Sequence, residues 1–299
     1  MNLKNRSAIS IIEKKVSVIG LGKSGYAATI LAHYLGGKVF ASDLGDTTEI
    51  LYRASQLRQK GIKCETGQHS NQIYDADLWV VSPGIPKEAD IIIEAQKYNI
   101  PIVGEIEFAS WFTETPIIAV TGSNGKTTTV HILAAMCQSD SINGKLAGNM
   151  GIPFSEIIID EIKYPDPNRV YILEISSFQM EFIHHFKPII GIFLNISPDH
   201  LDRHKTMAEY VAMKLNMVKN QTSGDAIVYN KDDPQLSKSI KNYPGKMLPF
   251  SLLQSNVIFP LNATKIYDAN GEPFIYMHDL ALPGKHNLAN MLAAATAAN

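Results

Sequence analysis

The chain has 299 residues, of which 45% are hydrophobic and 19% charged, and a formal net charge of −2. This composition is typical of a globular protein of about two domains, and the small net charge argues against a general affinity for nucleic acid or anionic lipid. The two cysteines, Cys64 and Cys137, lie too far apart for a C-x-x-C motif. The sequence also lacks a signal-peptide core and any run near the ~18 apolar residues of a membrane span, so we expect a cytoplasmic protein that binds neither nucleic acid nor membrane.

Residues 15–43 predict a strand, a helix and a second strand. The first strand runs directly into G-L-G-K-S-G at 20–25, and the second ends at Asp43. This is a βαβ unit with G-x-G-x-x-G and an acidic residue about 20 positions later, as in Rossmann-like dinucleotide sites. An NAD site is one interpretation. The pattern itself requires only a diphosphate at the helix N-terminus and hydrogen bonds from a ribose or base to Asp43.

A rigid loop follows the next predicted strand, at 77–81. Its sequence is Ser82-Pro83-Gly84-Ile85-Pro86, with prolines on both sides of the glycine. Ligands of open α/β sheets bind at the carboxyl ends of strands, and a simple turn is the alternative interpretation. We expect a domain boundary near 113–115.

The next segment predicts a phosphate-binding loop. An apolar strand at 117–120 leads into T-G-S-N-G-K-T-T, and a helix with an apolar face begins there. In such loops, backbone N–H groups and the helix N-terminus converge on a phosphate. Lys126 is predicted to reach the β- and γ-phosphates and the Thr127 hydroxyl to bind Mg²⁺. Val120 replaces the first glycine of the common pattern, and a glycine-rich turn is the alternative. The predicted ATP-binding residues of this loop are Gly122, Ser123, Asn124, Gly125, Lys126, Thr127 and Thr128.

Polar side chains interrupt two later apolar strands. The stretch 170–181 places Glu174 in an apolar strand and follows it with Ser176 and Gln179. A buried carboxylate is costly unless it is paired or bound to a metal, so Glu174 is predicted to bind a metal, with a buried salt bridge as the alternative. The stretch 188–204 ends in closely spaced Asp and His residues that include His200, for which a solvated loop is the alternative.

Three further positions each have two interpretations. Asn149 lies in a Gly-rich segment, and its two interpretations, a ligand contact and a turn residue, are about equally favoured. Lys214 lies among apolar residues of a predicted helix at 209–220, where a surface lysine with a buried stem is the ordinary interpretation. Asn287 precedes an Ala-rich helix and is a candidate for capping its N-terminus.

Together these motifs resemble the Mur ligases, the ATP-dependent amide-forming enzymes of peptidoglycan synthesis. The matching stretches cover the chain in the family's order: G-L-G-K-S-G, S-P-G-I-P, G-E-I-E-F, T-G-S-N-G-K-T-T, L-E-I-S-S-F-Q and L-P-G-x-H-N-x-x-N. Folylpolyglutamate synthases share much of the phosphate loop but lack such a domain before it. Alanine-adding Mur ligases usually carry His and extra Gly in the first loop, which this chain lacks. The resemblance is therefore to the D-glutamate-adding branch of the family.

The resemblance implies substrate contacts for individual residues. The first domain would hold the UDP of UDP-N-acetylmuramoyl-L-alanine rather than NAD. The residues implied at this substrate are Gly22, Lys23 and Ser24 at the diphosphate, Asp43, Ser82 and Gly84 around the uridine, and Asn149, Ser176 and Gln179 elsewhere.

The resemblance also implies a metal and ATP site. Thr127, Glu174 and His200 would bind Mg²⁺, and Mn²⁺ should substitute well because histidine is an unusual Mg²⁺ ligand. Lys214 would react with CO₂ to form a carbamate, a further metal ligand, which requires the neutral amine. His286 and Asn287 would bind ATP, with Asn287 at the adenine base.

The predicted fold is α/β, with a Rossmann-like UDP-substrate domain at 1–114 and a P-loop ATPase-like central domain at 115–299. The implied reaction adds D-glutamate through an acyl phosphate, with Lys126, His200 and Lys214 as catalytic residues, in a monomer. The alternatives are another Mur-superfamily amino-acid ligase and a nucleotide-binding module without catalysis. Because Mur ligases continue with a third domain that brings the amino-acid site, we expect a fragment that lacks this domain and is inactive in ligation by itself.

Overall fold

The computed structural model describes residues 9–198, 203, 206–262, 265–268, 271–276, 278, 280 and 283–299. By its internal contacts the chain divides into two units. The first comprises the chain up to Glu114 together with Gly151–Asp166 and Phe178–Phe186. The second comprises Thr115–Met150, Pro167–Ser177 and the chain from Lys187 onward. The linear domain prediction did not anticipate that two later segments complete the first unit.

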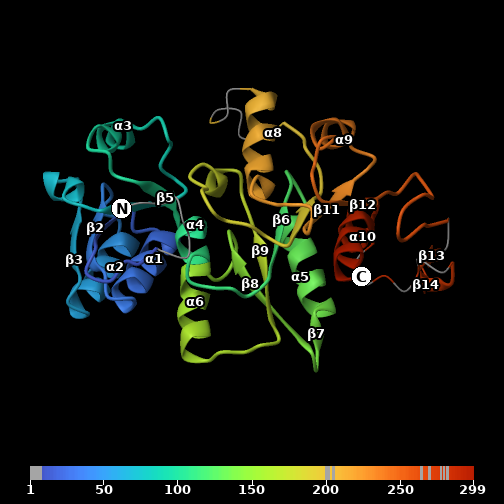
Figure 1. The fold of residues 1–299 in the computed structure, drawn as a ribbon, viewed down its shortest axis with the longest axis horizontal. Coiled ribbons are helices and arrows are strands. Elements are labelled where there is room, and N and C mark those ends of the chain that lie inside the picture. The colour runs from blue at the N-terminus through green and yellow to red at the C-terminus, as the bar shows by residue number, and fades with distance from the viewer. Residues whose placement is uncertain are drawn as a thin grey trace. The chain divides into compact units, whose positions relative to one another are not determined.

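The first unit contains a five-stranded parallel sheet (Figure 1). In sheet order its strands are β3 (Lys63–Thr66), β2 (Lys38–Asp43), β1 (Lys15–Ile19), β4 (Leu78–Val81) and β5 (Ile102–Gly104). All four residues of β4 and the last four of β1 are buried, as expected for central strands of a parallel sheet covered on both faces. The strand order reverses between β1 and β4, and the carboxyl ends beside such a point are where open α/β sheets bind ligands.

The helical segments of the first unit come from all three parts of the chain that form it. They are α1 (Lys23–Tyr34), α2 (Thr48–Gln59), η2 (Asn71–Tyr74), α3 (Asp90–Lys97), α4 (Glu105–Ser110), α6 (Phe154–Lys163) and η3 (Phe178–Met180).

A buried carboxylate ties the last of these parts to α4. The side chain of Glu107 is fully buried and accepts a hydrogen bond from Trp111 Nε1 at 2.7 Å. It also accepts from the backbone N–H groups of His185 at 2.7 Å and Phe186 at 2.8 Å. Three donors compensate the cost of burying the charge, so the segment 178–186 is a structural part of this unit.

The second unit contains a seven-stranded sheet. In sheet order its strands are β12 (Lys246–Phe250), β11 (Ala226–Asn230), β10 (Ile190–Phe193), β6 (Ile117–Thr121), β9 (Arg169–Glu174), β8 (Ile142–Gly148) and β7 (Gln138–Ser139). Only the β7–β8 pair is antiparallel within this sheet as described. A separate pair consists of β13 (Lys265–Tyr267) and β14 (Pro273–Tyr276).

The core of the second unit lies between this sheet and two of its helices. The described helical segments are α5 (Lys126–Met136), α8 (Met207–Leu215), η4 (Asn216–Val218), α9 (Pro234–Ser239) and α10 (Lys285–Ala298). In Figure 1, α10 (red) lies beside α5 (green), and apolar side chains of both pack against Val120, Ile172 and Ile192 of the central strands. The N-terminus of α5 is thereby held at the carboxyl end of β6.

None of the helices that the structure describes has the length and apolar character of a membrane-spanning segment.

Glu105, at the start of α4, is buried with incomplete hydrogen bonding. Its Oε1 accepts from the backbone N–H of Ser155 at 2.5 Å, whereas its Oε2 has no partner among the described residues. Burial raises the pKa of Glu105 to about 7, although the hydrogen bond from Ser155 opposes the shift. The folded first unit therefore favours the protonated carboxyl.

We predict that Glu105 makes the first unit less stable as the pH rises. A folded-state pKa above the ordinary value near 4.5 means that the stabilisation is complete below pH 4.5 and is lost as the pH passes 7. The loss amounts to about 3 kcal/mol in the free energy of unfolding, and Glu105→Gln should abolish it. Both tryptophans, Trp79 and Trp111, belong to this unit, so urea unfolding followed by tryptophan fluorescence measures it.

The control is Glu156→Gln, which removes an exposed carboxylate of the same unit. It should retain the wild-type pH dependence between pH 4.5 and 7.5. An identical pH dependence in wild type and Glu105→Gln would contradict the protonated carboxyl.

Candidate functional site

The loop between β6 and α5 closes around Lys126. The Nζ atom of Lys126 donates to the carbonyl oxygens of Gly122 at 2.8 Å and Ser123 at 3.1 Å. Gly125 precedes the helix at φ +88°, a left-handed conformation that favours glycine. The ammonium is held by two neutral carbonyls, and an anionic phosphate would be a stronger partner.

The segment after β10 fixes this loop from its other side. Asn195 and Asn124 exchange hydrogen bonds, from Asn124 N to Asn195 Oδ1 at 2.9 Å and from Asn195 Nδ2 to Asn124 O at 3.0 Å. The Ser123 hydroxyl donates to the Ser197 carbonyl at 2.9 Å and accepts from the Ser197 N–H at 3.0 Å. Sequence reasoning did not single out Asn195 or Ser197 as parts of the site, although both belong to the polar stretch after the strand.

Glu174, the last residue of β9, contacts two other predicted site residues. Its carboxylate is 2% exposed and accepts from Thr127 Oγ1 at 2.7 Å and from Asn149 Nδ2 at 2.9 Å. The Asn149 N–H also donates to the Glu174 carbonyl at 2.8 Å. The described residues include no salt bridge to Glu174, so the alternative of a buried salt bridge is not found.

The oxygen atoms of Thr127 and Glu174 are of the type that Mg²⁺ prefers. His200, predicted as another metal ligand, lies outside the described residues. Within the described part of the chain, no three His, Cys, Asp or Glu side chains are grouped so that they could hold a metal ion. A metal bound here would thus need ligands beyond the Glu174 carboxylate.

Lys214 is a buried residue of α8, so its interpretation as a surface lysine is wrong. The side chain is 2% exposed, and its Nζ donates to the Gly122 carbonyl at 3.1 Å. The Nζ also lies 4.5 Å from the centre of the Tyr210 ring, and the Tyr210 hydroxyl is 3.1 Å from Ser123 Oγ. Lys126 and Lys214 therefore meet at one carbonyl of the phosphate loop.

The first unit has a cavity of about 720 Å³ at the carboxyl edge of its sheet. It is lined by residues that the sequence predicted at a UDP substrate: Gly22, Lys23, Ser24, Asp43, Ser82 and Gly84. Apolar side chains, among them Leu44, Ile85 and Ile91, line it as well, together with His69, which sequence reasoning did not select. An apolar cavity with a few polar groups is typical of a site for a small organic ligand.

Asp43 also organises the backbone beside this cavity. Its Oδ2 accepts from the Leu21 N–H and its Oδ1 from the Gly45 N–H at 2.7 Å. Arg53 Nη1 donates to the Leu21 carbonyl at 3.1 Å from the other direction. Asp43 therefore holds the G-L-G-K-S-G loop in place in addition to lining the cavity.

Two family profiles match this chain, one in each part of the sequence. A profile of the Mur ligase middle domain matches residues 120–298, and a profile of the MurD-like N-terminal domain of Mur ligases matches residues 14–104. The chain belongs to the Mur ligase family.

Two relatives of this Mur ligase are each named UDP-N-acetylmuramoylalanine--D-glutamate ligase. The protein from Christiangramia forsetii is 37% identical over 295 residues, which cover 94% of this chain and 63% of the relative. The protein from Koribacter versatilis is 39% identical over 287 residues, which cover 94% of this chain and 62% of the relative. The chain thus spans less than two thirds of the length of these relatives.

Solved structures of similar fold are also Mur ligases. UDP-N-acetylmuramate:L-alanyl-gamma-D-glutamyl-meso-diaminopimelate ligase from Neisseria meningitides is 19% identical, with a TM-score of 0.65, and the match covers 95% of this chain and 93% of that one. UDP-N-acetylmuramate-alanine ligase from Thermotoga maritima is 21% identical, with a TM-score of 0.53, and the match covers 94% and 64%. These similarities confirm the predicted α/β fold.

The predicted adenine-side residues of this Mur ligase lie at the start of α10. The N-cap of this helix is Gly284, so the interpretation of Asn287 as the cap is wrong. The Asn287 amide donates to the Pro283 carbonyl at 2.8 Å, and His286 is exposed. One turn later, the buried Asn290 approaches the phosphate loop so closely that a Cβ on Gly125 would lie 2.3 Å from its Oδ1. Asn290 is the last residue of the L-P-G-x-H-N-x-x-N motif, so the sequence motif could have indicated it as a residue near the phosphate loop.

The remaining predicted substrate residues belong to different units. Ser176 follows β9 in the second unit and is half-buried, whereas Gln179 lies in η3 of the first unit and is 4% exposed. Thr128 is half-buried in the first turn of α5.

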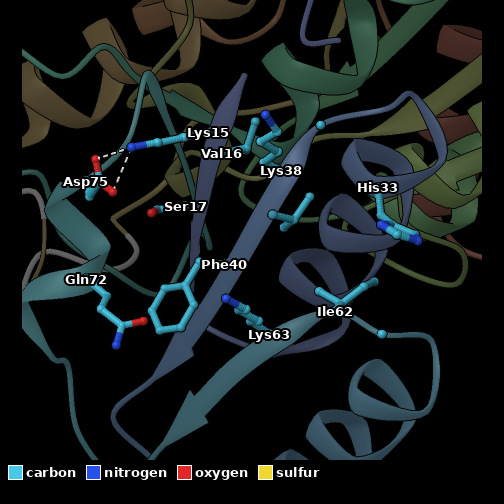
Figure 2. A pocket seen from close by; sticks show the side chains of 13 residues that line it. Lys15, Val16, Ser17, His33, Lys38, Phe40, Ile62, Lys63, Gln72 and Asp75 are labelled. Atoms are coloured by element: carbon cyan, nitrogen blue, oxygen red, sulfur yellow. Dashed lines mark hydrogen bonds and ion pairs between the residues drawn. The ribbon is translucent and has the colours of Figure 1, made fainter. Parts of the chain in front are cut away.

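A different cavity, of about 580 Å³, lies near the starts of β1, β2 and β3 (Figure 2). Lys15, Lys38 and Lys63 line it, and Lys15 Nζ pairs with both oxygens of Asp75 at 2.7 and 2.8 Å. Its wall includes residues at the C-terminal end of α1, where the helix dipole disfavours anions. None of the predicted site residues line it, so the carboxyl edge remains the candidate site.

We predict that Gly25→Ala destabilises the first unit by about 3 kcal/mol, because a Cβ there would lie 1.8 Å from the Gly20 carbonyl oxygen. Gly22→Ala in the same motif should cost under about 1 kcal/mol, since nothing lies within 4 Å of its Cβ position. Urea unfolding followed by tryptophan fluorescence compares the two variants. Equal stability of Gly25→Ala and Gly22→Ala would contradict the close approach of Gly25 to the Gly20 carbonyl.

Proposed function

We propose that this chain carries the nucleotide sites of a ligase that joins UDP-N-acetylmuramoyl-L-alanine to D-glutamate with ATP. The observation that supports this most is the contact of Thr127 with the buried Glu174 beside Lys126 in the phosphate loop. A phosphate lysine, a hydroxyl and a carboxylate at one sheet edge are the groups that phosphoryl transfer requires. The names of the two relatives supply the substrate class.

The first unit is proposed to bind the UDP part of the substrate. Gly22 and Lys23 begin α1, whose N-terminus favours a diphosphate. The apolar part of the cavity, with Ser82 and Gly84 beside it, is suited to the uridine. NAD is the weaker candidate because the chain already has a separate phosphate loop and because its relatives are ligases.

The second unit is proposed to bind ATP, with the phosphates at Gly122–Thr128 and the adenine toward His286 and Asn287. Thr127, Glu174 and His200 would hold Mg²⁺, or Mn²⁺ in its place. The bound metal would neutralise charge on the phosphates of ATP. Asn149, which donates to Glu174, would orient that carboxylate. Asn149, Ser176 and Gln179 are each proposed to contact the substrate.

The proposed reaction has two steps. The γ-phosphoryl group of ATP passes to the alanyl carboxylate, giving an acyl phosphate and ADP. The amino group of D-glutamate then attacks the acyl carbon and expels phosphate. The protein contributes mainly by positioning the reactants and by stabilising phosphate charge with Lys126. We further propose that the protein acts as a monomer.

The test of this function is phosphate release by the protein at its native length. The assay uses UDP-N-acetylmuramoyl-L-alanine, ATP and a panel of amino acids, and release is expected only with D-glutamate. Release with another amino acid would indicate another ligase of the superfamily. Nucleotide binding without release would indicate a binding module, and calorimetric binding of NAD but not of the UDP substrate would refute the assignment of the first unit.

Lys126→Ala is predicted to lower phosphate release by at least about a hundredfold, because it removes the cation that stabilises phosphate charge in the transition state. The fold should be retained, since the Lys126 ammonium bonds to carbonyls of a surface loop rather than packing in the core. Lys241→Ala, which removes an exposed lysine of the same unit, is the matched control. Activity of Lys126→Ala within tenfold of wild type would show that another residue serves the phosphates.

We also propose that Lys214 is carbamylated in the active enzyme. Its amine is buried beside the Gly122 carbonyl, away from the water that stabilises an ammonium. A carbamate would replace the positive charge with an anion whose oxygens suit a metal.

Carbamylation predicts a carbamate carbon signal in ¹³C NMR when the protein is equilibrated with labelled bicarbonate. Lys214→Met keeps the packing volume and should lose both the signal and ligation, whereas Lys241→Ala should keep both. Short carboxylic acids should partly restore Lys214→Ala by occupying the place of the carbamate. A fully active enzyme without this signal would refute carbamylation.

A further inference from the structure

His69 is the residue of the first-unit cavity for which neither the motifs nor the proposed reaction supplies a role. It follows β3, is half-buried and lines the cavity together with Asp43. Its Nδ1 atom lies 2.7 Å from the hydroxyl of Ser42, which is fully buried. The Ser42 hydroxyl in turn lies 2.7 Å from Glu65 Oε1.

The position of the Ser42 hydroxyl proton determines the tautomer of the His69 ring. A hydroxyl has a single proton to donate, and that of Ser42 goes to Glu65 Oε1, a closer and charged acceptor, rather than to the Gln68 carbonyl at 3.3 Å. Burial raises the pKa of Glu65, but the hydrogen bonds from Ser70 and Ser42 outweigh it, and the net shift is downward. The carboxylate therefore stays ionised, and Ser42 can only accept from His69. The ring proton lies on Nδ1.

The other ring nitrogen, Nε2, is then an acceptor. Burial lowers the pKa of His69, and the carboxylates of Glu65 and Asp43 offset this only in part, so the ring is neutral near pH 7. The described residues give Nε2 no hydrogen-bond partner. A neutral imidazole in the Nδ1–H tautomer has a lone pair on Nε2. A ligand in the cavity can form a hydrogen bond with this atom only by donating one.

The place of His69 suits the base of a nucleotide. Adjacent strands are about 4.8 Å apart, so the end of β3 lies roughly 10 Å from the end of β1, where α1 begins. A nucleotide whose diphosphate lies at α1 and whose ribose lies near Asp43 therefore brings its base toward His69. The apolar side chains of Leu44 and Ile50 line the same cavity.

Uracil and cytosine differ at N3, the atom that could donate a hydrogen bond to such an acceptor. Position N3 of uracil carries a hydrogen, whereas N3 of cytosine carries a lone pair. We propose that His69 is a specificity-determining residue that selects uracil by accepting a hydrogen bond from its N3–H, with the Glu65–Ser42 pair fixing the required tautomer. The inference rests on the proposed binding of a UDP substrate by the first unit.

The experiment compares binding of UDP and CDP to the chain by calorimetry. Wild type should prefer UDP by at least tenfold, because cytosine would set two lone pairs against each other in a desolvated site. His69→Ala should bind UDP about tenfold more weakly and lose most of the preference over CDP. Circular dichroism and tryptophan fluorescence confirm that each variant is folded.

A matched pair of substitutions at Glu65 tests whether the Glu65–Ser42 pair fixes the tautomer of His69. Glu65→Gln keeps an acceptor oxygen for Ser42 and Ser70, and should keep the preference for UDP. Glu65→Ala frees the Ser42 proton for Nδ1, which moves the ring proton to Nε2, and should abolish or reverse the preference. The ¹⁵N NMR signals of His69 report the tautomer directly and should change in Glu65→Ala but not in Glu65→Gln.

The outcomes separate this inference from the proposed function. If wild type binds neither UDP nor UDP-N-acetylmuramoyl-L-alanine, the assignment of the first unit fails. If wild type binds them and His69→Ala weakens the binding of UDP and of CDP equally, His69 contacts the ribose or the diphosphate. That result would overturn the inference about uracil alone. An unchanged preference for UDP in both His69→Ala and Glu65→Ala would overturn it as well.

Discussion

A carboxylate buried at the end of a central strand sets the geometry of the second unit's site. Glu174 has no cation beside it among the described residues, so its two oxygens require donors from neighbouring segments. In the sheet, Glu174 is paired with Val120 of β6 on one side and Gly148 of β8 on the other. The donors come from the segments that follow, Thr127 from the start of α5 and Asn149 directly after β8. The strand register and the phosphate loop after β6 thus bring three separate motifs to one point.

The two lysines of this site share one hydrogen-bond acceptor. Lys126 and Lys214 both donate to the Gly122 carbonyl, which is neutral and belongs to a loop rather than to a carboxylate. The backbone of the loop is also shaped by its contacts to Asn195 and Asn290.

Much of this architecture was predictable because local patterns determine it. The strand–loop–helix units around Gly22 and Gly125 follow from apolar runs ended by glycines, and the family motifs identified Thr127 and Glu174. Burial of Lys214 was not predictable from periodicity, since its environment comes from the phosphate loop about 90 residues earlier. The contact of Asn290 with the phosphate loop and that of His69 with Ser42 likewise join residues far apart in the sequence. Asn287 resembled a helix cap, but Gly284 begins the helix three residues earlier.

The discontinuity of the first unit has a consequence for how the protein is made. When a ribosome has synthesised the chain up to Glu114, the sheet of this unit is complete, but α6 and the segment that ends at Phe186 do not yet exist. Until then Glu107 lacks two of its three hydrogen-bond donors, and its charge cannot be buried at low cost. We therefore expect this unit to mature only after two segments of the next unit, Thr115–Met150 and Pro167–Ser177, have been synthesised, which departs from the usual order in which domains fold one after another.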